Sequence, residues 1–145
     1  MLSLMLLSVL PSGCSQGGVV EGEVHYKFVT GMQDRRYFII VRNEPTDGQP
    51  SIVFDPAAEE EIRRCFPSEG NLVVDNSTEA QIEVFYTRIE YIVSLHLASG
   101  DEAKYSYYQA CKANREDFNK LVVGSRVIVE TQPSDIGPVI TRIVE

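Results

Sequence analysis

The chain has 145 residues and a formal net charge of −8, with 21 acidic against 13 basic side chains. That length is enough for a single domain with a hydrophobic core of its own. An acidic domain repels phosphate backbones, so we expect no nucleic-acid partner, and the net charge provides no attraction to an anionic lipid surface.

The first twenty residues carry no charge and contain a nearly unbroken apolar run from Leu2 to Leu10. Pro11, two small residues and Cys14 follow this run. An apolar core followed by small residues is the layout of an export signal, and the run is too short to span a bilayer. The alternative is an ordinary buried strand or short helix in which the cysteine is incidental.

The Ser12-Gly13-Cys14 step, followed by Ser15-Gln16-Gly17-Gly18, resembles the processing site of bacterial lipoproteins. The resemblance implies that residues 1–13 are a signal peptide and that Cys14 becomes the lipidated first residue. Residues 14–19 would then form a flexible tether to a single domain over residues 20–145. The implied location is the cell envelope, with the lipid on Cys14 in a membrane. Because no Asp follows Cys14, that membrane would be the outer one, on its periplasmic side, in a Gram-negative organism.

The first half of the domain shows strand patterns. Residues 19–29 alternate between apolar and polar side chains, which predicts a half-buried strand with His25 and Lys27 on the solvated side. Residues 36–42 are apolar on both faces and predict a central strand. A loop over 43–50, a short strand over 51–54 and a helix from Asp55 to about Cys65 follow.

The second half is predicted to be β-rich as well. Residues 75–78 indicate a turn, and residues 81–97 a long strand whose alternation slips near Thr87 and Arg88, which calls for a bulge or a bend. A hairpin turn over 98–102 and a strand over 104–110 follow. Asn114 caps a short helix over 115–122. Strands over 126–131 and 138–144 flank a turn at 132–137 and complete the chain.

The segment from Phe118 to Val144 resembles the closing hairpin of small OB-like barrel modules found in bacterial envelope proteins. The matching residues are Leu121, Gly124, Val127, Val129, Gly137 and Ile143. The resemblance implies a mainly β fold, a partly open OB-like barrel with one or two short helices. Modules of this kind bind ligands such as oligosaccharides on one face, although the fold alone does not establish a function.

Two cysteines, Cys65 and Cys111, remain in the domain if Cys14 is lipidated. In an oxidising compartment such a pair tends to bridge, so we predict a disulfide that closes a loop of about 45 residues. The alternative is two separate thiols acting as small hydrophobic side chains. The chain has no CxxC motif, and His25 and His96 lie far apart in the sequence, so we predict neither a metal site nor a cofactor.

No catalytic motif is present, and Ser94 and His96 are read as ordinary strand positions. Tyr105, Tyr107 and Tyr108 are the best candidates for a partner-binding surface, because tyrosine offers a large contact area at low entropic cost. The alternative is that two of the three pack the barrel. We therefore expect a non-catalytic, lipid-anchored envelope module that binds a protein or glycan partner. The alternatives are a small envelope enzyme with an unrecognised site, and a cytosolic domain.

Overall fold

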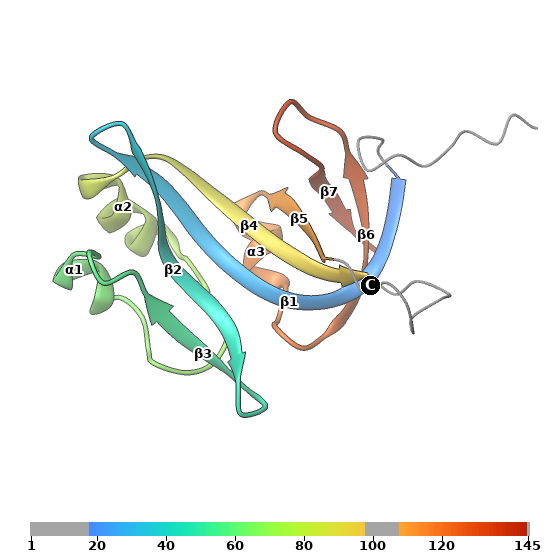
Figure 1. Ribbon diagram of the computed structural model, residues 1–145, viewed down its shortest axis with the longest axis horizontal. Helices are drawn as coiled ribbons and strands as arrows, with labels where there is room; N and C mark the ends of the chain where they lie inside the picture. The colour runs from blue at the N-terminus through green and yellow to red at the C-terminus, as the bar shows by residue number, and fades with distance from the viewer. Residues whose placement is uncertain (1–17, 98–107, 145) are drawn as a thin grey trace, which may run out of the picture.

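The computed structural model describes residues 18–97 and 108–144 (Figure 1). These residues form a mainly β fold, as the sequence predicts, with three helices where one or two were expected. The elements are β1 (Gly18–Gln33), β2 (Arg36–Thr46), β3 (Gln49–Phe54), α1 (Glu60–Arg63), α2 (Asn76–Phe85), β4 (Thr87–Leu97), β5 (Tyr108–Ala113), α3 (Arg115–Lys120), β6 (Arg126–Gln132) and β7 (Val139–Ile143).

Five of the strands form a ring closed by hydrogen bonds. β1 pairs with both β4 and β6, β4 pairs with β5, and β6 pairs with β7, all antiparallel. The last side of the ring is a parallel contact between β5 and β7 at one residue pair, Lys112 and Val139. The ring is therefore closed at this seam by very few hydrogen bonds. This agrees with the expectation of a partly open, OB-like arrangement.

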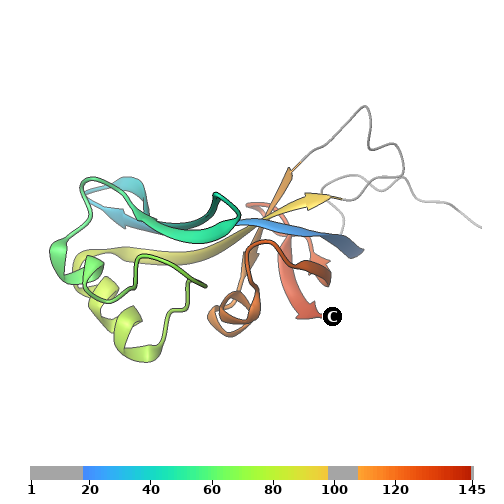
Figure 2. The same ribbon diagram turned by 90° about the horizontal axis from the view of Figure 1, so that it is seen from below.

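The remaining elements extend the sheet beyond the ring. The chain between β1 and β4 forms β2, β3, α1 and α2, and β2 and β3 continue the sheet outward from the far half of β1 (Figure 1). We call residues 34–86 the insertion. Figure 2 shows that the helices lie on one side of the long sheet. Among residues 18–97 and 108–144, no helix covers the other side of β1, β4 and β5.

β1 exchanges its faces at a bulge. Val24 pairs with Leu95 and Tyr26 pairs with Ser94, so His25 is an extra residue in the strand. One extra residue shifts a period of two by one position. Val24 is buried before the bulge, and Lys27 is buried after it. The prediction that Lys27 faces solvent is therefore wrong. The sequence alternates between polar and apolar residues without a break, whereas the bulge reverses which residues of the strand face the core.

Residues 75–86 are the largest difference from the predicted elements. They form α2 instead of a turn and the start of a strand. Asp75 begins the helix, since its side chain accepts a hydrogen bond of 2.7 Å from the backbone N–H of Thr78. Thr78 and Ile82 lie one turn apart and are both buried. The slip in alternation near Thr87 thus marks the junction of a helix with a strand.

Two other elements differ in extent. The predicted helix from Asp55 shrinks to α1, and the Asp55 side chain instead accepts a hydrogen bond from the N–H of Ala57 in a turn. The predicted loop over 43–50 is a hairpin with a two-residue turn at Asp47 and Gly48, whose φ angles are 50° and 78°. The short helix capped by Asn114 and the two closing strands are confirmed.

Candidate functional site

The predicted tyrosine surface is partly within the structure. Tyr108 begins β5 with 52% of its surface exposed. Tyr105 and Tyr107, like Cys14, lie outside the described residues.

Tyr108 lies against two histidines from different strands. Its ring centroid is 4.9 Å from that of His96, its partner across the β4–β5 ladder, and 4.7 Å from that of His25. Tyr26 contacts His25 edge to face at 4.0 Å. We call His25, Tyr26, His96 and Tyr108 the aromatic cluster. Aromatic rings at these separations attract each other beyond the area they bury.

The aromatic cluster lies on the side of the sheet that the helices leave uncovered. In β4, Val93 and Leu95 are buried in the core, so the alternate residues Ser94 and His96 point to the other face. Nε2 of His96 is shielded from solvent and has no hydrogen-bond partner among the residues described.

The sequence predicted Tyr108 and missed both histidines. They are 71 positions apart in the chain, and neither local pattern indicates that β1 and β4 bring them together on one face of the sheet. A hairpin between the strands over 81–97 and 104–110 was predicted, but the register that pairs Ser94 with Ala110 and His96 with Tyr108 was not.

Lys27 is the most perturbed ionisable group on the covered side. Its side chain is completely buried, and Nζ donates hydrogen bonds to Leu121 O at 2.6 Å, Leu72 O at 2.7 Å and Asn71 Oδ1 at 3.0 Å. Nζ also lies 4.4 Å from the centroid of the Phe118 ring. All of these partners are neutral. Burial lowers the pKa of Lys27 to about 7.

Two asparagines complete the polar network around Lys27. Asn43 is fully buried, and it donates to Gly70 O at 2.9 Å and accepts from the N–H of Leu72 at 3.0 Å. Asn119 bonds both the N–H and the carbonyl of Val74, each at 2.8 Å. The segment 70–74 has no strand partner over these positions, so side chains satisfy its backbone. The network therefore fastens the insertion to the ring.

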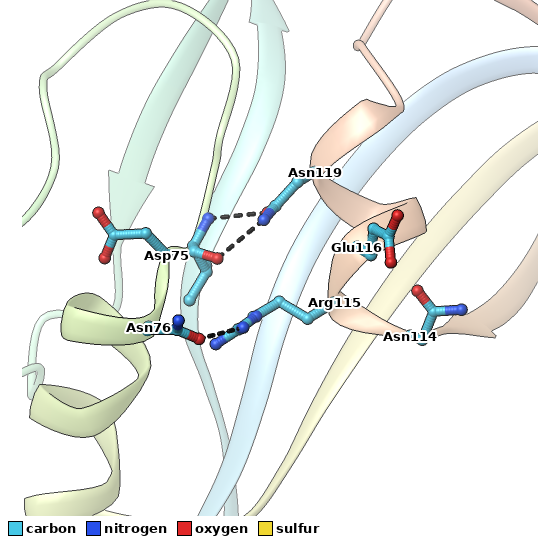
Figure 3. A pocket seen from close by; sticks show the side chains of 7 residues that line it. Asp75, Asn76, Asn114, Arg115, Glu116 and Asn119 are labelled. Carbon is cyan, nitrogen blue, oxygen red and sulfur yellow. Dashed lines mark hydrogen bonds between the residues drawn. The ribbon is translucent and has the colours of Figure 1, made fainter.

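An open hollow of about 510 Å³ lies beside this segment, between the starts of α2 and α3 (Figure 3). In Figure 3, Asn119 reaches from α3 toward the backbone of Val74, and Arg115 points toward Asn76. Arg115 also forms an ion pair with Glu79 at 3.3 Å. The charge of Arg115 is thereby neutralised. Its contacts with Asn76 and Glu79 join α3 to α2 beside the hollow.

The predicted disulfide is not formed, and both Cys65 and Cys111 are free thiols. Cys65 follows α1 and is half-buried, with Sγ 3.2 Å from Glu61 O. Cys111 is fully buried in β5, where burial raises the pKa of its thiol to about 11. Cys65 belongs to the insertion, in the turn after α1, whereas Cys111 belongs to β5 in the ring. The structure thus has the alternative arrangement of two separate thiols.

Comparison with known proteins gives no relative: no family model, curated protein or solved structure matches the chain. Within residues 18–97 and 108–144, no cluster of three or more His, Cys, Asp or Glu side chains is arranged to hold a metal ion. Over the same residues no helix has the length and apolar character needed to cross a membrane.

Proposed function

We propose that this protein is a non-catalytic binding or structural module of the cell envelope, anchored through a lipid on Cys14. Its partner docks on the uncovered face of β1, β4 and β5, centred on the aromatic cluster. The observation that carries this proposal is the packing of Tyr108 against His25 and His96 on a face that no helix of the described part of the chain covers.

The chemistry of that face supports binding to a partner of large surface. Tyr108 is half exposed, and rings held by their neighbours lose little freedom on binding. Two imidazoles already pack against the Tyr108 ring, which leaves less of its face for a single sugar ring. We therefore favour a protein partner over a glycan.

A catalytic role has less support. The group most shifted toward neutral pH, as catalytic amines are, is Lys27. Its side chain has no exposed surface, and its three acceptors come from the protein itself. A substrate therefore has no access to Nζ, and the structural role described above accounts for its contacts.

One observation favours a second location. Free, separated thiols at Cys65 and Cys111 are typical of a reducing compartment, so a cytosolic domain is the competing proposal. Intact mass of the protein from the membrane fraction of its native host separates the two. A chain beginning at Cys14 with added acyl mass supports the anchored module, whereas an unprocessed chain in the soluble fraction supports the cytosolic domain.

Site-specific photo-crosslinking in the native host tests the binding face. A photoreactive residue at Ala110, which is exposed beside the aromatic cluster, is compared with one at Ile136, which is 64% exposed in the β6–β7 turn. We expect a discrete adduct from position 110 that disappears with Tyr108→Ala. Equal adducts from both positions, or an adduct at 110 that survives Tyr108→Ala, would reject the proposal.

A further inference from the structure

The tip of the β1–β2 hairpin gathers three arginines. Arg35 and Arg36 lie in and after the turn, and Arg88 lies next to them at the start of β4. The pairs Gln33–Arg36 and Met32–Thr87 place Arg36 on β2 and Arg88 on β4, one on each side of β1. Neighbouring strands are about 4.8 Å apart, so Arg36 and Arg88 are separated by about 10 Å. We call Arg35, Arg36 and Arg88 the basic tip.

The charge of the basic tip is not neutralised within the described part of the chain. None of the three pairs with a carboxylate there, whereas Arg64, Arg115 and Arg142 each bind a glutamate. The turn itself contributes one acid, Asp34, so the residues of the turn and the basic tip carry three positive charges against one negative. On a chain of net charge −8, this is a concentration of the opposite sign.

The backbone of the basic tip is unusual for arginine. Arg35 has φ = 63° and Arg88 has φ = 50°, in the left-handed region that favours glycine and asparagine. The β2–β3 hairpin has a turn of the same kind and places Gly48 at the position equivalent to Arg35. Side chains kept in disfavoured conformations cluster at functional sites.

We propose that the basic tip docks on an anionic phospholipid bilayer. Exposed apolar side chains accompany the charge, since Tyr37 is 58% and Ile39 is 42% exposed just beyond Arg36 on β2. Arginine together with tyrosine and aliphatic side chains is the composition of surfaces that lie at the headgroup level. A phosphate group also matches the planar fork of the guanidinium.

The acidity of the remaining chain does not oppose this docking. The basic tip and Gly18 lie at opposite ends of β1, whose 16 residues span about 50 Å when extended. The screening length in physiological salt is about 8 Å. Acidic side chains at the Gly18 end of β1, such as Glu21 and Glu23, are therefore several screening lengths from the basic tip, and the net charge of the whole chain does not describe the charge at the tip.

Vesicle co-sedimentation tests the proposal. The full chain carries Cys14→Ser so that no acyl group contributes, and vesicles of phosphatidylcholine are used with and without phosphatidylglycerol. We expect binding only to the anionic vesicles, weakening as salt is added. The variant Arg35→Asn/Arg36→Thr/Arg88→Asn should lower the partition coefficient by about 100-fold. Its thermal stability should not fall, because asparagine suits the left-handed positions.

A matched variant removes the same charge elsewhere. Arg64→Ser/Lys120→Ser/Arg126→Ser should bind as the parent does. The proposal is overturned by equal binding to neutral vesicles, or by an equal loss in the matched variant. It is also overturned if glycerol phosphate in solution binds at the tip while vesicles do not, since that result assigns the arginines to a soluble phosphate compound.

Discussion

Nζ of Lys27 donates a hydrogen bond of 2.6 Å to the carbonyl oxygen of Leu121, and so joins the first strand to the end of α3. A second bond, to Leu72 O, brings in the segment that follows the insertion's hairpin. One buried ammonium therefore holds three distant parts of the chain.

Because Lys27 is buried, the free energy of unfolding should rise with pH between about 7 and 10.5. The pKa of Lys27 is about 7 in the folded protein and 10.5 in the unfolded chain, so between these values the unfolded state holds the extra proton. The contribution of the neutral Lys27 side chain to the free energy of unfolding is fully present above pH 10.5, falls with falling pH, and is gone below pH 7. Urea unfolding should show stability rising by up to about 1.4 kcal/mol per pH unit within this window. Lys27→Met should lack that rise, and an unchanged pH profile would contradict the assignment.

Substitutions in the two hairpin turns should change the free energy of unfolding in opposite directions. Arg35→Gly relieves a left-handed arginine and should stabilise by about 1 kcal/mol. Gly48→Ala places a side chain at φ = 78° and should destabilise by about as much, although a Cβ there meets no atom within 4 Å. Thermal unfolding should resolve both shifts, at about 3 °C each. Shifts of the same sign would show that conformation is not the cause.

The approach of β1 to β4 depends on a glycine. A Cβ at Gly22 would lie 2.7 Å from the carbonyl oxygen of His96, so Gly22→Ala must push the strands apart. We expect a loss of about 2–4 kcal/mol in urea unfolding. Gly18→Ala is the control, since a Cβ at Gly18 meets nothing within 4 Å. Similar losses in both variants would mean that the contact at His96 relaxes freely.

The thiols should differ in reactivity in the native protein. In the Cys14→Ser chain, iodoacetamide should modify Cys65, which is half-buried near the surface, and leave Cys111 unmodified until urea unfolds the protein. Burial protects Cys111 and also raises its pKa to about 11, which suppresses the reactive thiolate. Peptide mass mapping reads both sites. If both thiols are protected and reduction removes the protection, the result would support the predicted disulfide between Cys65 and Cys111.

Local signals predicted the C-terminal part well. Asn114 and the acidic residues after it give a helix start that depends on nothing distant, and the structure confirms the hydrogen bond from the N–H of Asp117. The last two strands were also predicted from local signals, because Gly124 and the turn at 132–137 mark where they begin and end. Tyr108 was selected as a candidate because tyrosines in a short strand stand out in composition, and its role as a binding residue stays a prediction.

The predictions that were wrong share one cause, since each of these features depends on residues far away in the sequence. Ile82, Val84 and Tyr86 alternate as in a strand, but they lie in and just after a helix that is started by Asp75 and held in place by the sheet it packs on. The bulge at His25 depends on how β1 pairs with β4, 70 residues later. Burial of Lys27 follows from that bulge, so neither the polar network nor the paired histidines can be read from the sequence around them.

The position of β1 also sets an order of events during synthesis. β1 is the earliest described strand to leave the ribosome, yet its first residues pair with residues 126–131, near the end of the chain. The hydrogen bond from Thr131 Oγ1 to Gly18 O spans 113 positions. Contacts at such separations form slowly. The start of β1 therefore keeps an unpaired edge until residues 126–131 have been made, and the ring closes late among the folding steps of the described residues.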